Sequence, residues 1–282
     1  RKAIARGIVR SIMIQAPAIL VAGSLAFDEI YTYSGAIREH LPDSKESPIY
    51  FNFRARGPFR SPGGCGGNTA YTLALFQAPV KVSSWLGQDG GEYLIRLQQL
   101  GIDTSAVAIF ENMPTLRAVL LVDSREDQIL VFNDPGERVE PPLPSMAGVG
   151  LTIVTAGVPG RTADITKLSR AAGIPFIVDP GKLIMDVPPA LLLEAIDGAD
   201  SLVLNEYEKD LLLKRTACSW REISAMVAVS VITAGSRGLT IELSGGREHI
   251  PAARPARLID PNGAGDAFLA GYSFGRYKGF SP

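Results

Sequence analysis

The residues with the strongest chemical meaning form one string near the C-terminal end, Asp260-Pro261-Asn262-Gly263-Ala264-Gly265-Asp266. Residues 263–265 have little or no side chain, so their backbone N–H groups can approach a ligand closely. The stretch that follows is typical of a helix start, and free amides at a helix N-terminus make an anion site. A carboxylate there suits a base that takes the proton of a hydroxyl attacking a phosphate. The alternative is a tight turn in which Asp266 caps the helix.

A second glycine-rich string, Gly63-Gly64-Cys65-Gly66-Gly67-Asn68, leads into a segment with Leu73 and Phe76 on its apolar side. The glycines let the backbone pass against a bound ligand, and Asn68 can donate to a hydroxyl or cap the helix. Glycine-rich turns before helices are common, so a purely structural role is an equal alternative. The string does not match the G-x-G-x-x-G fingerprint of dinucleotide-binding proteins, because position 69 is Thr.

Three further candidates come directly after predicted strands. Asn205 and Glu208 are three residues apart and share one side of a helical start, where a solvated first turn is the alternative. Asp28 follows the first predicted strand, and a lone Asp in a loop is ordinary. The turn Thr233-Ala234-Gly235-Ser236-Arg237-Gly238 ends another strand.

The elements that must position these residues alternate between short apolar runs and helix-like stretches. The predicted strands are Ile19–Ser24, Val80–Leu86, Leu151–Ala156, Phe176–Asp179, Ser201–Asn205 and Val229–Thr233. The predicted helices are Asn68–Phe76, Gly91–Leu100, Ala163–Ala172, Pro189–Ile196 and Trp220–Ala228. Apolar strands alternating with helices indicate a mostly parallel sheet covered on both faces, whose ligands bind at the carboxyl ends of the strands.

Two segments break this alternation and show strand-like patterns without helices between them. We expect residues 31–59 and 106–132 to form a small separate β-sheet that closes over the site as a lid. Within the second segment, residues 123–127 predict a hairpin turn between Leu116–Val122 and Gln128–Phe132. The α/β domain would then comprise residues 17–30, 60–105 and 133–282, and residues 1–16 an N-terminal extension.

Composition excludes several classes of function. Apolar residues make up 46% of the 282 residues and charged ones 20%, which allows a sizeable core. Lys plus Arg (28) and Asp plus Glu (29) nearly balance, so no basic excess indicates nucleic-acid binding. The apolar runs are too short to span a bilayer. Two cysteines, Cys65 and Cys218, suit a reducing cytoplasm rather than a disulfide framework or a zinc site.

Together, the two glycine-rich strings resemble the signatures of the PfkB (ribokinase-like) carbohydrate kinase family, which includes ribokinases, fructokinases and adenosine kinases. The resemblance extends from about Ile19 to the end of the chain. It implies a doubly wound α/β fold with a mostly parallel sheet, flanking helices and a small β lid. It also implies ATP-dependent phosphorylation of a primary hydroxyl in the cytoplasm.

The resemblance also assigns roles to the residues of the acceptor site. In the family, the Asp of the Gly-Ala-Gly-Asp turn is the catalytic base and the amides before it form the anion hole. These roles fall to Asp266 and to Gly263, Ala264 and Gly265. Asp28 stands where the family has an Asp that grips vicinal hydroxyls. The remaining expected acceptor contacts are Gly63, Gly64 and Asn68.

Nucleotide and metal contacts follow from the same resemblance. Asn205 and Glu208 match the N-x-x-E motif that organises Mg²⁺ and its water shell near the nucleotide phosphates. The expected ATP contacts are Thr233, Gly235, Ser236, Gly238 and Asn262. Pro261 replaces a Thr that is frequent in the family, which argues against a bound K⁺ or other monovalent cation.

The expected acceptor is a nucleoside, because Phe51-Asn52-Phe53 and the first glycine-rich string are most similar to adenosine-kinase-like members. Five aromatic residues suit either stacking on a base or packing on a strand surface: Tyr31, Tyr33, Tyr50, Phe51 and Phe53. A ribokinase- or fructokinase-type sugar kinase is the second candidate, and a non-catalytic ligand-binding protein on the same fold is the third. The expected partners are therefore the acceptor and ATP, with a homodimer through the lid as a further possibility.

Overall fold

A computed structural model describes residues 16–40, 52–125, 127–133, 139–157, 159–257 and 262–282. Residues 1–15 of the predicted N-terminal extension lie outside these ranges, as do the aromatic residues Tyr50 and Phe51 and also Pro261. In the described part of the chain, no helix combines the length and apolar composition that crossing a bilayer requires.

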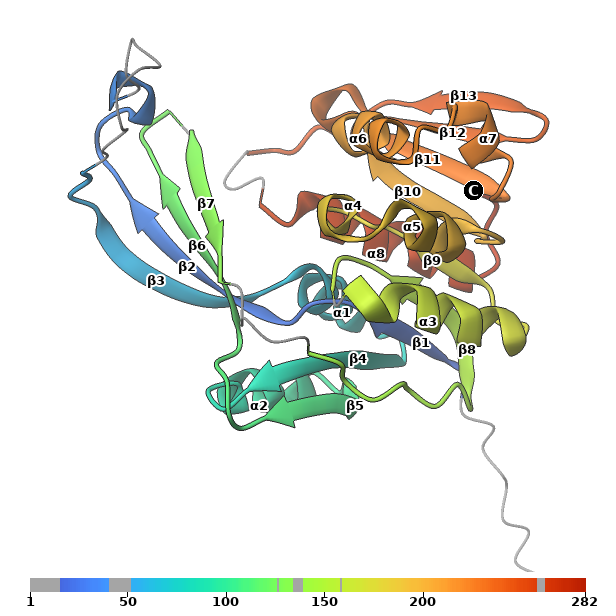
Figure 1. The fold of residues 1–282 in the computed structure, drawn as a ribbon, viewed down its shortest axis with the longest axis horizontal. Coiled ribbons are helices and arrows are strands. Elements are labelled where there is room, and N and C mark those ends of the chain that lie inside the picture. Colours follow the sequence, from blue (N-terminus) through green and yellow to red (C-terminus); the bar gives the residue numbers. More distant parts are fainter. Residues whose placement is uncertain (1–15, 41–51, 126, 134–138, 158, 258–261) are drawn as a thin grey trace, which may run out of the picture.

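The described residues form a large and a small sheet, which lie apart in Figure 1. The large sheet has the strand order β13-β12-β11-β10-β9-β8-β1-β4-β5. Its strands are β1 (Ala18–Ala22), β4 (Val80–Gly87), β5 (Asp103–Phe110), β8 (Val149–Val154), β9 (Phe176–Val178), β10 (Ser201–Asn205), β11 (Val229–Thr233), β12 (Leu239–Leu243) and β13 (Gly246–Ile250). All neighbours from β11 to β5 pair in parallel, whereas β12 and β13 are antiparallel additions at one edge.

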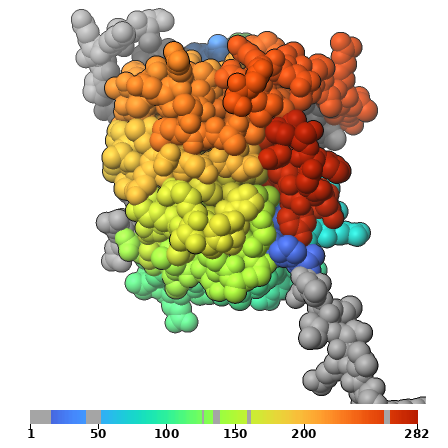
Figure 2. All heavy atoms as spheres, turned by 90° about the vertical axis from the view of Figure 1, so that its right-hand side faces the viewer, coloured from blue at the N-terminus to red at the C-terminus, as the bar shows by residue number. Residues whose placement is uncertain are grey.

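Helices cover both faces of the large sheet. Successive residues of a strand point to opposite faces, so strands that are apolar throughout must be covered on both. In β10, for example, Val203 packs with one buried cluster, whereas Leu202 and Leu204 pack with the other. The first cluster contains residues of α1 (Cys65–Leu75), α2 (Gly91–Gln99) and α8 (Ala264–Tyr277). The second contains residues of α4 (Leu183–Asp186), α5 (Pro189–Ile196), α6 (Glu206–Thr216) and α7 (Trp220–Ser224). Ile165 of α3 (Pro159–Ala171) packs on Ala22 and Val154. Figure 2 shows the segments from α3 to α7 as one continuous surface, with α8 at its edge.

The small sheet has the order β3-β2-β6-β7 and consists of β2 (Ala26–Thr32), β3 (Arg56–Gly63), β6 (Leu116–Val122) and β7 (Gln128–Phe132). The predicted hairpin between β6 and β7 is confirmed, with Val122 opposite Gln128. We call this small sheet the lid. It is joined to β1 through only Gly23, Ser24 and Leu25, so β2 continues almost directly from the large sheet.

Three details of the lid differ from the predicted segments. Residues 106–110 belong to β5, which pairs with β4 in the large sheet. The lid strands β2 and β3 include residues 26–30 and 60–63, which the prediction placed in the α/β domain. The predicted loop position of Asp28 is wrong, because this residue lies inside β2, opposite Ser61 of β3 and Ala118 of β6. Charged and aromatic residues in β2 obscured its strand pattern.

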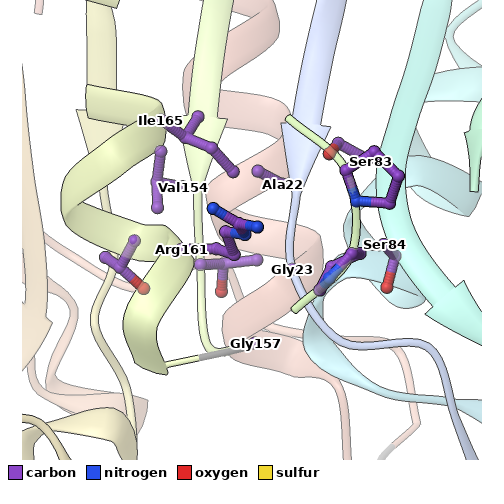
Figure 3. Close-up of a pocket in the computed structure, with 12 residues that line it drawn as sticks. Ala22, Gly23, Ser83, Ser84, Val154, Gly157, Arg161 and Ile165 are labelled. Carbon is purple, nitrogen blue, oxygen red and sulfur yellow. The ribbon is translucent and has the colours of Figure 1, made fainter. Parts of the chain in front are cut away.

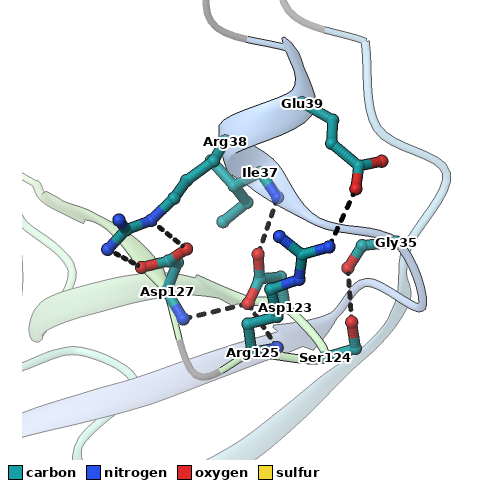
Figure 4. Close-up of polar contacts among 8 residues, drawn as sticks. All are labelled: Gly35, Ile37, Arg38, Glu39, Asp123, Ser124, Arg125 and Asp127. Atoms are coloured by element: carbon teal, nitrogen blue, oxygen red, sulfur yellow. Dashed lines mark hydrogen bonds and ion pairs between the residues drawn. The ribbon is translucent and has the colours of Figure 1, made fainter.

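The tip of the lid is held by a group of polar contacts around Asp123 (Figure 4). Its Oδ2 atom accepts the backbone N–H of Ile37, in the short 3₁₀ helix η1 (Ile37–His40), at 2.6 Å. Its Oδ1 atom accepts the N–H groups of Arg125 and Asp127 at 2.8 and 2.9 Å. Arg38 adds an ion pair to Asp127 at 2.6 Å. Asp123 therefore fixes the β6–β7 turn to the segment that follows β2.

Candidate active site

A cavity of about 730 Å³ lies between the lid and the carboxyl ends of β9, β10 and β11. Its lining combines residues of the lid strands β2, β6 and β7 with residues that follow strands of the large sheet. Seven of the predicted site residues line it: Asp28, Gly64, Asn205, Glu208, Thr233, Gly265 and Asp266. The structure thus brings together candidates that are up to 238 positions apart in the sequence, between Asp28 and Asp266.

The two glycine-rich strings meet through a hydrogen bond between their polar residues. Asn68 of α1 donates from Nδ2 to Asp266 Oδ2 at 2.8 Å. Gly263 is the N-cap of α8, with φ of 73°, and no side chain caps this helix. Asp266 therefore does not act as the cap, and its carboxylate is turned toward α1. Gly265 and Asp266 line the cavity, whereas Gly263 and Ala264, which directly precede them, are exposed and do not line it.

Burial raises the pKa of Asp266 above the ordinary value for aspartate, although hydrogen bonds from Asn68 and the thiol of Cys65 oppose this effect. A carboxylate with a raised pKa is a stronger base than a solvated one while it remains ionised near neutral pH. The structure therefore provides a half-buried, positioned carboxylate next to free helix amides.

Gly63 makes room for Asp28. A Cβ atom at Gly63 would lie 2.3 Å from Asp28 Oδ2, a distance at which the carboxylate could not remain. The Gly63 carbonyl oxygen accepts a hydrogen bond from the hydroxyl of buried Tyr93 at 2.7 Å. This bond fixes the C-terminal end of β3. Burial and the charge of Asp266 raise the pKa of Asp28, so the two carboxylates are close enough to interact.

Asn205 and Glu208 form a capping box at the start of α6. Asn205 Oδ1 accepts the N–H of Glu208 at 2.8 Å, and Glu208 Oε2 accepts the N–H of Asn205 at 2.9 Å. The capping box gives both residues a structural role that is independent of the predicted binding of a metal. It also holds both side chains at the cavity wall, and Glu208 Oε1 takes no part in it.

The predicted nucleotide-binding turn folds into the short 3₁₀ helix η2 (Gly235–Arg237) after β11. Thr233 lines the cavity, whereas Gly235, Ser236 and Gly238 lie beyond it. A Cβ atom at Gly238 would lie 2.1 Å from the carbonyl oxygen of Ile250 in β13, so this glycine is required by the fold itself. Asn262 is exposed in the turn before α8 and does not line the cavity either.

Several lining residues were missed by the sequence analysis. Asp179 and Lys182 line the cavity from the loop that follows β9. Both stand at the carboxyl end of a parallel strand, the same signal that singled out Asn205 and Thr233. Phe132 and Asn133 stand at the end of the lid strand β7, where no sequence signal separates a lining residue from an edge residue.

Of the five aromatic residues predicted to suit base stacking, the three that the structure describes (Tyr31, Tyr33 and Phe53) do not line the cavity. Tyr33, His40 and Phe53 instead pack edge-on against one another, with ring centroids 5.0 to 5.7 Å apart. Packing within the lid therefore accounts for Tyr33 and Phe53. Tyr31 lies in β2 and is half-buried.

Three glycines form a close seam beside the cavity. A Cβ atom at Gly66 would lie 2.6 Å from the carbonyl carbon of Gly23, and one at Gly157 would lie 2.9 Å from its Cα atom. Real Cβ atoms do not approach other atoms so closely, so the backbone of α1 and of the segment after β8 can lie against Gly23, which follows β1, only because these three residues are glycines. On the other side of this seam is a second cavity of only about 20 Å³, into which Arg161 points (Figure 3). It has room for about one water molecule.

A mostly parallel sheet, a β lid and a glycine turn next to a carboxylate are the parts of a ribokinase-like kinase. The pfkB family carbohydrate kinase model matches residues 51–281, and the chain belongs to this family. The prediction of the family and of the fold class is therefore confirmed, and so is the prediction of a kinase.

Relatives of both acceptor classes are similar to this chain. Ribokinase of Bacillus subtilis is 25% identical over 271 residues, which are 93% of this chain and 86% of the relative. A nucleoside kinase of Methanocaldococcus jannaschii is 25% identical over 222 residues, covering 77% and 73%. The solved structure of Burkholderia thailandensis nucleoside kinase in complex with inosine has a TM-score of 0.81 and 32% identity, covering 94% of this chain and 86% of that one. The chain is thus a sugar or nucleoside kinase.

Proposed function

We propose that this kinase transfers the γ-phosphoryl group of ATP to a primary hydroxyl of a nucleoside, with Asp266 as the base. The observation that carries the proposal is the hydrogen bond from Asn68 to Asp266, which joins the two glycine-rich strings at the cavity. It holds a carboxylate of raised basicity beside the exposed amides of Gly263, Ala264 and Gly265.

The proposed step is an in-line transfer. The acceptor oxygen forms a bond to the γ-phosphorus as the bond from that phosphorus to the β–γ bridging oxygen breaks, and ADP leaves with the electron pair. The proton of the hydroxyl passes to Asp266. The amides at the start of α8 hold the developing negative charge of the phosphoryl group. Asp28, Gly63, Gly64 and Asn68 orient the acceptor so that its hydroxyl faces Asp266.

The phosphates of ATP require positive charge, and the cavity fits a phosphate-bound magnesium ion rather than a protein-enclosed one. Among the described residues, no group of three or more acidic, His or Cys side chains is arranged to hold a metal. Mg²⁺ commonly keeps its waters and uses one or two carboxylates with substrate phosphates. Asn205 and Glu208 would hold it through water, and it would neutralise phosphate charge. Thr233, Gly235, Ser236, Gly238 and Asn262 would contact the nucleotide.

A nucleoside is favoured over a free sugar by two observations. Phe132 gives the cavity an aromatic wall on which a base can pack. The nucleoside kinase of Burkholderia thailandensis, solved with inosine and with ADP and inosine, is 32 to 33% identical. A sugar kinase is the second candidate, because ribokinase of Bacillus subtilis matches 93% of this chain.

The test is ADP formation by the purified chain with Mg²⁺, ATP and a panel of adenosine, inosine, ribose and fructose. We expect turnover with nucleosides, with the phosphate located on the 5′ oxygen by ³¹P NMR. Turnover with sugars alone would establish the second candidate. Ligand-induced thermal stabilisation without any ADP formation would instead identify a non-catalytic binding protein.

A further inference from the structure

Lys182 forms a bridge from the large sheet to the lid. It follows β9 in the loop Asp179-Pro180-Gly181-Lys182 and lines the cavity. Its ammonium nitrogen lies 4.6 Å from the centroid of the Phe132 ring at the end of β7. An ammonium group at this distance from an aromatic ring is attracted by the negative face of the ring. The contact therefore crosses the cavity from one sheet to the other.

The cavity contains more negative than positive charge. Five acidic side chains line it: Asp28, Asp179, Asp186, Glu208 and Asp266. Burial raises the pKa of Asp179 well above its ordinary value and favours its protonated form, so the other four supply the negative charge. Among the described residues that line the cavity, the basic ones are Arg117 and Lys182.

Arg117 is already engaged. It lies 2.7 Å from Asp89 and 3.6 Å from Glu29, so its charge is neutralised within the lid and the adjoining loop. Lys182, in contrast, forms no ion pair with a described residue. Its charge opposes the rise in pKa of Asp28 on the lid side and of Glu208 on the α6 side. Lys182 is thus within electrostatic reach of both ends of the cavity.

We propose that Lys182 binds the phosphoryl group during transfer, and that Phe132 positions its ammonium when the lid covers the cavity. This inference rests on the proposed kinase function and adds a residue pair to it. A phosphoryl group entering a cavity lined by four carboxylates needs a compensating cation beyond the helix amides. A lysine side chain carries its ammonium group on a flexible chain of four carbons. A ring that restrains the ammonium therefore holds the positive charge at one position. Because Phe132 belongs to the lid, the restraint exists only when the lid is closed.

The alternative is that Lys182 only offsets the repulsion among the carboxylates. The two roles differ in what Lys182→Met would change. A phosphate contact affects turnover and the binding of a transition-state mimic, whereas general charge compensation affects stability and the binding of ADP and of the mimic alike.

The experiment compares Lys182→Met, Lys182→Arg, Phe132→Leu and the double variant Lys182→Met/Phe132→Leu. The matched control is Lys209→Met, because Lys209 lies 4.1 Å from the ring of Trp220, outside the cavity. Each protein is assayed for kcat and for KM, and for thermal stabilisation by ADP with Mg²⁺, with and without aluminium fluoride and the acceptor.

We expect Lys182→Met to lower kcat by about 10²-fold, the usual loss for one group that stabilises transition-state charge. It should keep stabilisation by ADP but lose the additional stabilisation by aluminium fluoride, and Lys182→Arg should restore part of both. Phe132→Leu should lower kcat by about 2- to 10-fold, in line with a cation–π contact. It should have no further effect in the Lys182→Met background, and Lys209→Met should behave as wild type.

The inference is overturned if Lys182→Met retains kcat within about threefold, or if the losses from the two single variants multiply in the double variant. An active wild-type protein with an unaffected Lys182→Met variant removes this inference alone. A wild-type protein that transfers no phosphate to any acceptor removes the proposed function, and this inference with it.

Discussion

Two carboxylates of this protein, Asp123 at the tip of the lid and Asp266 at the start of α8, differ in the donors that each receives. Asp123 accepts three backbone N–H groups, and although burial alone raises its pKa, these amides together bring it below the ordinary value. Asp266 accepts from the side chains of Asn68 and Cys65, and burial keeps its pKa raised. Both side chains are sheltered from solvent, so burial alone does not separate them.

The difference shows how a structural carboxylate can be told from a reactive one. Backbone amides donate to both carboxylate oxygens of Asp123, favour its ionised form and make the residue a part of the turn. Asp266 retains lone pairs that face a cavity beside free helix amides. A buried carboxylate that still has free hydrogen-bond acceptor positions can accept a proton from a substrate.

The largest expected effect is that of Asp266→Asn on turnover. The amide cannot accept the hydroxyl proton, so kcat should fall by about 10²–10⁴-fold, the usual contribution of a positioned base. The Tm should not fall, because the substitution removes a desolvated charge. Steady-state ADP formation measures the first and differential scanning fluorimetry the second, with exposed Asp210→Asn as the control. Near-native turnover would remove Asp266 from the role of base.

Asn68→Leu should have the next largest effect, and it tests how the donor tunes the base. Loss of the 2.8 Å hydrogen bond removes support for the ionised form of Asp266, so the pKa of Asp266 rises further. The acid limb of the kcat/KM profile should move to higher pH, with about a tenfold loss at neutral pH. An unchanged limb would show that Asn68 serves only the acceptor.

Asp123→Ala should lower stability and preserve activity, the opposite of what we expect for Asp266→Asn. The folded pKa of Asp123 is depressed, so its contribution to stability is present above its unfolded pKa and is lost as pH falls through the folded pKa. The Tm should fall by several degrees at neutral pH, and the gap to wild type should close as the solution is acidified below about pH 4. A loss of kcat larger than that of Asn68→Leu would contradict the separation of the two regions.

Asp179→Asn should produce the smallest change, a slight gain in Tm. Asp179 is buried beside Glu208 and Asp266, so burial first and these charges second raise its pKa well above the ordinary value. The fold favours its protonated form, and wild-type stability is lost as pH rises from the unfolded pKa toward the folded one. The neutral variant should therefore match wild type in acid and exceed it at neutral pH. The N–H of Gly181, which lies 3.1 Å from Asp179 Oδ1, still finds an acceptor in Asn.

The large sheet was accessible from the sequence because its strands are apolar on both faces. Ser201–Asn205 and Val229–Thr233 were predicted to the residue, and so was helix Pro189–Ile196. The lid was harder, since β2 and β3 expose polar residues and pair with partners far along the chain. Period-2 apolar patterning is weak in such strands, and their register is set by tertiary contacts.

The residues of the candidate site likewise fall into those that the sequence indicates and those whose role only the structure reveals. Asp266, Asn68 and Glu208 belong to local strings of the sequence, and the family resemblance that these strings carry assigned their roles. Lys182 and Phe132 gain their meaning from a contact across the cavity between segments 50 residues apart. The capping box of Asn205 and Glu208 is visible in the sequence as a spacing, but only the structure shows that it also places both side chains at the cavity wall.

The seam of Gly23, Gly66 and Gly157 has a consequence for redesign of this enzyme. An added methyl group at any of its three members would push a sheet strand, a helix and a loop apart together, and would distort the nearby cavity. Libraries that aim to change the acceptor should therefore keep these three positions invariant and diversify the lid residues Leu116 and Ala118, which line the cavity and are not themselves part of the Lys182–Phe132 contact. Selectivity can then be altered without rebuilding the catalytic end of the molecule.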